Sequence, residues 1–377
     1  LYTDSMEKLN GLGTRLKHKV QVSFVNQHGA EEAGIDGGGV FKEFLDDLIK
    51  DGFASSQSDT DQRSHIGAPP LFSVTPHQTL AINFDYIDDP ELLNHYEFLG
   101  RVLGKAVYES ILVEPQFCLP FLNQLLGKTN STEDLKNYDE EYYNNLNKLK
   151  GLSDSEIEAL GLNFEVTVGG HTSRGSPRTV ELIPGGRYIA VKTKTHIFQY
   201  IHAVANQLLN VQGARQTKAF LRGFRDLIPA SWVRLFSANE LQNLISGDDS
   251  VRGIDVSSLK QAMNYLGGYH HSQPYIHDFW DIVENELTPE QQRKFLRFMT
   301  SCSRQPLLGF GSLDPSPSIQ QIRLEEEPSK SSKLPSSQTC FNLLKLPNYK
   351  SKSLLRDDIG HLLLPYFTTT GKLCIKS

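Results

Sequence analysis

The chain has 377 residues, of which 38% are hydrophobic and 22% charged, a composition typical of a globular protein with a hydrophobic core. At about 150 residues per domain, this length predicts two or three domains. The net charge of −6 excludes nucleic-acid binding driven by bulk positive charge, because no global field would gather phosphates. No apolar run approaches the roughly 18 residues that cross a bilayer, and no leader pattern opens the chain, so we expect no membrane partner. Because the chain starts at Leu1 and not at Met, we expect a piece of a longer protein.

Cysteine usage points to a reducing compartment. Four cysteines in a chain of this length are too few and too scattered for a disulfide framework. No two of them have the spacing of metal ligands, so we expect no metal ion, and the location we expect is the cytoplasm, the nucleus or both. The cysteines are Cys118, Cys302, Cys340 and Cys374.

The first 50 residues are predicted to form a strand, a turn and a helix. Apolar and polar residues alternate from Val20 to Phe24, the period of a half-buried strand. Gly37-Gly38-Gly39 matches neither common glycine pattern of nucleotide-binding loops, so we interpret it as a tight turn and expect no nucleotide cofactor. The following helix carries its apolar residues on one face and is expected to stop at Gly52.

The next part of the chain changes from a helical to a strand period. Apolar residues spaced three or four apart from Leu92 to Ile111 predict a long amphipathic helix that ends before Pro115. Residues 132–150 form a polar, acidic helical segment. From residue 164 the period is two, which predicts strands, the last of them over 188–191. We expect this hairpin and its flanking helices to form a small subdomain.

The pattern returns to helix over residues 196–245, with Trp232 and Phe236 expected in the core. The stretch from Gly247 to Gly253 holds two glycines and three charges in seven residues, which predicts a domain boundary or hinge. Farther on, Thr288-Pro289-Glu290-Gln291 has the pattern of a capping box at a helix start.

Cys340 lies between a long polar connector and the strand-like run from Phe341 to Leu346. A thiol there is expected to be accessible on one side and held by a strand on the other, as a nucleophile requires. The alternative is a small buried hydrophobe, the commonest role of a lone cysteine. A cysteine hydrolase would also need a histidine, and only His361 lies downstream. Cys118 is expected in the core and Cys302 at a helix end.

The sequence from Thr339 to Pro347, TCFNLLKLP, resembles the catalytic-cysteine segment of the HECT ubiquitin ligases. Other stretches resemble that family in the same order along most of the chain. The resemblance is greatest to the HECT ligases that carry a calmodulin-binding IQ motif ahead of the domain. The further matching stretches are residues 33–40, 98–106, 240–247, 265–269, 279–280 and 303–310.

The resemblance implies an α+β fold with two lobes. Residues 1–247 would form a mainly helical N-terminal lobe, into which a β-hairpin subdomain that binds the conjugating enzyme is inserted at about residues 127–200. Residues 248–253 would be the hinge, with Asp248 and Gly253 at its ends. Residues 254–377 would form a smaller α/β C-terminal lobe that bears the cysteine.

The resemblance also implies a ubiquitin-protein ligase without a cofactor. Cys340 would accept ubiquitin from a conjugating enzyme as a thioester and pass it to a lysine of a protein substrate. Thr339 and Asn342 would order the loop around Cys340 by hydrogen bonds. The implied partners are therefore ubiquitin, a ubiquitin-conjugating enzyme and a protein substrate.

In this family, apolar residues of the inserted subdomain grip the conjugating enzyme. Exposed apolar side chains would suit a modest, reversible interface. The alternative is that the same residues merely pack the subdomain, and the sequence leaves both interpretations open. The corresponding residues here are Tyr142, Leu146, Leu149 and Tyr200.

Two features depart from the family. Gln338 stands two residues before Cys340, where many members have histidine, so acid-base help from that position is absent. Near the end, where the family continues as a helix, Gly360 and Pro365 are expected to break helical periodicity, and Phe367 stands ten residues from the last residue. Because the tail helps to deliver ubiquitin in the family, the alternative function is a transfer-impaired or non-catalytic module that binds ubiquitin or the conjugating enzyme.

Overall fold

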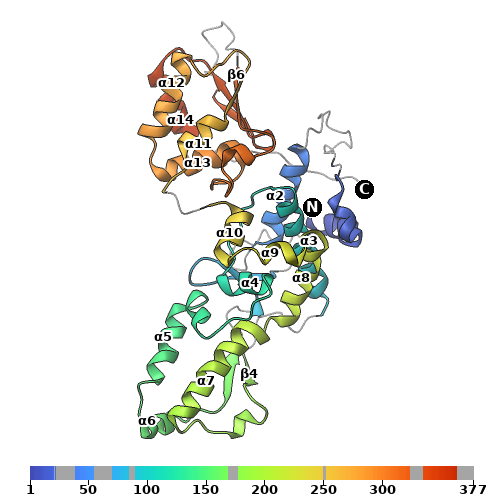
Figure 1. Cartoon of the computed structure of the whole chain (residues 1–377), viewed down its shortest axis with the longest axis vertical. Helices are drawn as coiled ribbons and strands as arrows, with labels where there is room; N and C mark the ends of the chain where they lie inside the picture. The colour runs from blue at the N-terminus through green and yellow to red at the C-terminus, as the bar shows by residue number, and fades with distance from the viewer. Residues whose placement is uncertain are drawn as a thin grey trace.

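We describe the chain from a computed structural model (Figure 1). It is an α+β protein in which helices predominate and three small sheets are formed within the described part of the chain. None of the described helices is both long enough and apolar enough to span a membrane. The structure describes residues 1–20, 22, 39–54, 70–84, 90–168, 177–248, 252–322 and 334–362, with only the backbone of 39, 40, 340, 361 and 362.

The first of three hydrophobic clusters lies in the middle of the molecule in Figure 1. Its centre is the close crossing of α3 (Leu92–Tyr108) and α8 (Ala214–Leu227). A Cβ on Gly100 would lie 2.0 Å from the carbonyl oxygen of Phe220, so the crossing requires glycine there. The surrounding elements are α1 (Tyr2–Leu9), a 3-10 segment (Asn10–Lys17), α2 (Gly39–Gly52), β1 (Phe72–Val74), β2 (Leu80–Ile82), α4 (Leu119–Leu125), α9 (Ala230–Val233) and α10 (Ala238–Ser246).

The second cluster forms the end of the molecule drawn at the bottom of Figure 1. Its core contains Leu146 and Tyr200, and an antiparallel hairpin of β3 and β4 belongs to the same region. The elements are a 3-10 turn (Glu133–Asn137), α5 (Glu140–Leu149), α6 (Asp154–Ala159), β3 (Glu165–Val168), β4 (Arg178–Glu181) and α7 (Lys194–Asn206), which continues as a π-turn over Gln207–Val211.

The third cluster forms the opposite end and contains the four-stranded sheet. The strand order is β5-β6-β8-β7, with β7 antiparallel to β8 and the other pairs parallel. The elements are α11 (Val256–Ala262), β5 (Asn264–Leu266), α12 (Pro274–Asp281), α13 (Pro289–Thr300), β6 (Ser318–Ile322), β7 (Ser336–Gln338), β8 (Leu343–Pro347) and α14 (Lys352–Leu362).

Three expectations from the sequence are wrong. Trp232 is 56% exposed, because the short helix α9 turns it away from the core. The strand expected over residues 188–191 is instead a 3-10 turn, Gly186–Tyr188, followed by a single bridge at Ala190. Gly360 does not interrupt α14, because one glycine costs a helix only about 1 kcal/mol and the backbone hydrogen bonds continue.

Other expectations are confirmed or lie outside the described residues. The helix that ends at Gly52 forms, and Thr288 makes the expected capping box with Gln291. Most of the segment from Val20 to Phe24 and the glycines at 37 and 38 lie outside the description, as do residues 363–377, which include Pro365 and Phe367.

Candidate active site

The segment that carries Cys340 connects two strands of the four-stranded sheet. Thr339–Phe341 forms one 3-10 turn between β7 and β8. β8 is an inner strand, since it pairs with β6 on one side and with β7 on the other. The backbone of Cys340 is therefore carried by a rigid element of the fold, which favours accurate placement of a reacting group.

Asn342 fixes the exit from this turn. Its backbone is left-handed, with φ 48° and ψ 38°, a conformation that asparagine tolerates better than most residues. Its side chain is fully buried, and its Nδ2 donates a hydrogen bond of 2.6 Å to the carbonyl oxygen of Pro315. Its backbone N–H donates to the carbonyl of Thr339 at 3.1 Å. Asn342 thus orders the turn through both its main chain and its side chain.

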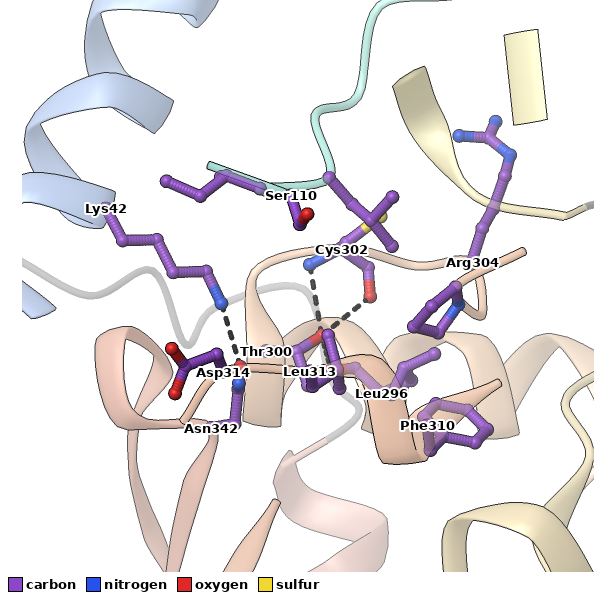
Figure 2. Close-up of a pocket in the computed structure, with 13 residues that line it drawn as sticks. Lys42, Ser110, Leu296, Thr300, Cys302, Arg304, Phe310, Leu313, Asp314 and Asn342 are labelled. Carbon is purple, nitrogen blue, oxygen red and sulfur yellow. Dashed lines mark hydrogen bonds between the residues drawn. The ribbon is translucent and has the colours of Figure 1, made fainter. Parts of the chain in front are cut away.

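Lys42 reaches this turn from α2, a helix of the first cluster. Its Nζ donates to the carbonyl oxygen of Thr339 at 3.2 Å and to Oδ1 of Asn342 at 2.8 Å. Figure 2 shows the Lys42 side chain extending from α2 toward Asn342. Lys42 is 9% exposed, so these two oxygens replace much of the water that would otherwise solvate its ammonium group. This contact joins two residues that are 300 positions apart in the chain.

A narrow cleft lies beside this contact (Figure 2). Its volume of ≈ 20 Å³ holds about one water molecule. Within the described residues, no group of three His, Cys, Asp or Glu side chains is placed to hold a metal ion. The cleft lies between segments of the first and third clusters, and is lined by Lys42, Ser110, Ile111, Leu112, Leu296, Thr300, Cys302, Arg304, Pro306, Phe310, Leu313, Asp314 and Asn342.

Two other cysteines are buried and poorly suited to act as nucleophiles. Cys302 lines the cleft but is only 3% exposed. Its burial, and to a smaller extent the nearby carboxylate of Glu114, raises the pKa of its thiol to about 12. Burial also raises the pKa of the Cys118 thiol to about 12. Because the thiolate is the reactive form, neither sulfur is activated near neutral pH. Cys302 lies just after α13 and Cys118 in the core, as the sequence predicts.

A second set of contacts joins the two clusters near the predicted hinge. The carboxylate of Glu114 accepts a hydrogen bond of 3.1 Å from the backbone N–H of Ser303 and lies 3.6 Å from Nη1 of Arg304. Asp248 donates its backbone N–H to the carbonyl of Gln305 at 2.7 Å. These contacts tie the end of α10 and the segment before Pro115 to the chain that follows α13.

The predicted hinge is described only at its ends. Asp248 forms the backbone bridge above, and residues 249–251 lie outside the described residues. Gly253 has φ +90°, a backbone conformation that favours glycine. Its role as a hinge stays a prediction.

The predicted face for a conjugating enzyme is only partly exposed. Leu146 and Tyr200 are buried in the second cluster, because α5 packs on α7, so these two residues match the alternative that the sequence left open, in which they pack the subdomain. Tyr142 and Leu149 are half-buried at its edge. Phe198 and Tyr188, which are not among the residues predicted for this face, are more exposed, at 54% and 85%.

Phe198, Lys42 and Glu114 are not among the predicted site residues, and they differ in how clear a signal the sequence carries for each. Phe198 lies off the buried face of α7, and a large apolar residue on the solvent side of an amphipathic helix is a recognisable signal. Lys42 shares a helical face with the buried Leu45 and Ile49, and a cation on an apolar face is likewise a signal of a buried partner. No sequence pattern distinguishes Glu114.

The chain belongs to the HECT-domain (ubiquitin-transferase) family, whose model matches residues 61–361. Among its relatives, ubiquitin-protein ligase E3B from Homo sapiens is 39% identical over 96% of this chain. E3 ubiquitin-protein ligase UPL6 from Arabidopsis thaliana is 39% identical over 92%, and E3 ubiquitin-protein ligase HUL5 from Saccharomyces cerevisiae is 36% identical over 94%. The matched regions cover only 34%, 32% and 36% of these three proteins, respectively.

Proposed function

We propose that this chain is the catalytic part of a ubiquitin-protein ligase that carries ubiquitin as a thioester on Cys340. Membership of the ubiquitin-transferase family supports the class of reaction. The observation that carries the choice of residue is the ordered turn at Thr339–Phe341, beside a cleft between two clusters. Cys118 and Cys302, in contrast, are buried with raised pKa values.

The proposed reaction has two acyl transfers. The Cys340 thiolate attacks the carbonyl carbon of the thioester that links ubiquitin to the conjugating enzyme, and the enzyme's own thiolate leaves. A neutral lysine amine of the substrate then attacks the new thioester, the C–S bond breaks, and an amide forms with loss of one proton. The first transfer exchanges like for like and the second is downhill, so positioning is the main task of the protein.

The bonds around the turn suit this task. The side chain of Asn342 is held by Pro315 and Lys42, and the main chain of Thr339 is held by Lys42 and Asn342. We propose that both residues support the catalytic turn, as the resemblance implies. A turn held in this way approaches each partner with little loss of conformational entropy.

We propose that the three clusters correspond to the parts of a bilobal enzyme. The first and second would form the N-terminal lobe with its inserted hairpin subdomain, and the third the C-terminal lobe that moves about residues 248–253. On this proposal the second cluster binds the conjugating enzyme. Tyr142 and Leu149 would contact it directly, while the buried Leu146 and Tyr200 would support the face from beneath.

The proposal extends to the parent protein. The resemblance to ligases with an IQ motif leads us to propose that such a motif precedes the domain and binds calmodulin. Calmodulin capture by the full-length protein tests this subgroup assignment. We also propose a cytoplasmic or nuclear location, which imaging of the tagged full-length protein tests.

The function is tested with ubiquitin, activating enzyme, ATP and a panel of conjugating enzymes, followed on non-reducing gels. We expect a ubiquitin adduct that thiol reductant removes and that Cys340→Ala abolishes, whereas Cys302→Ala, a buried cysteine, retains it. Added lysine is expected to discharge the adduct. An adduct that lysine cannot discharge would instead favour the transfer-impaired module. The absence of an adduct with every conjugating enzyme would contradict catalysis and leave only a binding role.

A further inference from the structure

Lys42 connects the first cluster to the turn of Cys340 through hydrogen bonds to Thr339 and Asn342. Its two acceptors bracket the cysteine, since Thr339 directly precedes it and Asn342 follows two residues later. We infer that Lys42 is a positioning residue, which holds this turn against the first cluster while ubiquitin is transferred to lysine. The inference rests on the proposed function and adds the residue that sets the geometry of its second step.

The acceptor side of the contact is preorganised. The amide of Asn342 is buried, and its Nδ2 is already bound to the carbonyl of Pro315, so its Oδ1 is aimed toward α2. The donor side is also fixed, because Lys42 belongs to a helix whose apolar face packs in the first cluster. A cation donating to two oriented oxygens gives a stronger and more directional contact than a neutral pair.

The contact acts together with a second one. Glu114 binds the backbone N–H of Ser303, close to the predicted hinge. Together the two contacts hold the third cluster against the first beside the cleft, Lys42 through the turn of Cys340 and Glu114 through the segment after α13. Lys42 is the point that lies at the turn of Cys340, so its loss is expected to affect the reacting group most.

The geometry assigns this contact to the second step, transfer of ubiquitin to lysine, and not to the first step, formation of the thioester on Cys340. In Figure 1 the third cluster and the second cluster, on which the conjugating enzyme is proposed to bind, lie at opposite ends of the molecule. The turn must therefore leave Lys42 to collect ubiquitin and return to it afterwards. Two hydrogen bonds that water can replace make such a contact reversible, since each contributes a modest net stabilisation.

The test separates the two steps in Lys42→Met, which keeps the length of the side chain and removes its charge and donors. In single-turnover assays we expect the rate of thioester formation to stay within about twofold of wild type. We expect discharge of the isolated thioester to free lysine to slow about tenfold, the size of one charge-assisted hydrogen bond. Lys50→Met is the matched control, because Lys50 lies on the same helix and pairs with Asp46.

Two further substitutions at Lys42 test whether its hydrogen-bond donors matter. Lys42→Arg retains donors and is expected to discharge faster than Lys42→Met. Discharge at the wild-type rate in Lys42→Met would overturn the inference, and so would an equal slowing of both steps, which indicates a general structural role. If Lys42→Met does not fold by circular dichroism, Lys42→Gln is judged by the same criteria. Failure of the wild-type chain to form any thioester would instead contradict the proposed function.

Discussion

At the scale of single residues, Asn342 both stabilises the fold and holds the turn that carries the proposed nucleophile. It takes a left-handed backbone, fills a fully buried position and bonds to segments from two clusters. An asparagine can satisfy all three demands, because it tolerates positive φ and its amide both donates and accepts. The sequence resemblance implies a supporting role for this residue, but the partners Lys42 and Pro315 are far away in the chain.

We predict that Asn342→Ala destabilises the chain by about 2–4 kcal/mol, because it strains the backbone and leaves the carbonyl of Pro315 without its donor. Asn342→Gly loses the same hydrogen bonds but tolerates φ 48°, so it is expected to be less destabilised by about 1 kcal/mol. Urea unfolding followed by circular dichroism measures both. Equal stability of the two variants would contradict the backbone argument.

The buried thiols give a prediction about pH. The pKa of Cys302 is raised to about 12, so the folded chain holds this proton more tightly than the unfolded chain does. The contribution to stability is complete below the ordinary pKa of about 8.5 and is lost as the pH rises toward 12. At pH 8 we expect iodoacetamide to leave Cys302 and Cys118 unmodified until urea unfolds the chain, as measured by peptide mass spectrometry. Rapid alkylation in the folded state would contradict this.

At the scale of elements, the helix crossing of α3 and α8 shows what sequence patterns convey and what they omit. The apolar period from Leu92 predicts α3 and its buried face. It does not predict that Gly100 and Gly223 face backbone of the other helix, because the partner of a helix depends on the whole fold. Nor does the sequence pattern predict that α14 continues through Gly360, where nothing lies within 4 Å of an added Cβ.

These glycines give a paired prediction. Gly100→Ala is expected to destabilise the chain by about 3 kcal/mol or more, because its Cβ would lie 2.0 Å from a backbone oxygen. Gly360→Ala is expected to stabilise it by about 0.5–1 kcal/mol, since alanine favours the helix and the space is open. Thermal unfolding compares the two. A stabilising Gly100→Ala or a strongly destabilising Gly360→Ala would contradict the respective environments.

Two leucines of α5 are predicted to have different roles, Leu149 in binding the conjugating enzyme and Leu146 in packing the second cluster. Leu149→Ala, at the half-buried edge, is expected to weaken conjugating-enzyme affinity about tenfold with a loss of stability below about 1 kcal/mol. Leu146→Ala empties a buried position and is expected to cost about 2–4 kcal/mol of stability. Calorimetry of binding and urea unfolding measure the two quantities. Unchanged affinity in Leu149→Ala would place the interface elsewhere, with the exposed Phe198 as the next candidate.

At the scale of the whole molecule, the described residues form three hydrophobic clusters, and the polar contacts of Lys42 and Glu114 join the first to the third. The resemblance of contiguous stretches to one family implies the α+β class, which the structure confirms, and it selects Cys340 as the candidate nucleophile. It does not predict the contact of Lys42 with Asn342, which forms only when two clusters meet. The sequence pattern also misjudges Trp232 and leaves the burial of Leu146 open, since the exposure of both depends on how neighbouring elements are placed.

Cys340 is proposed to carry ubiquitin, and the chemistry of the bond that forms at this residue tests the proposal. In Cys340→Ser we expect a ubiquitin oxyester, an adduct that survives thiol reductant and is cleaved by mild base, whereas wild type forms an adduct that the reductant removes. Peptide mass spectrometry is expected to place ubiquitin on residue 340. A reductant-sensitive adduct that persists in Cys340→Ser would show that another cysteine carries ubiquitin and would contradict the role proposed for Cys340.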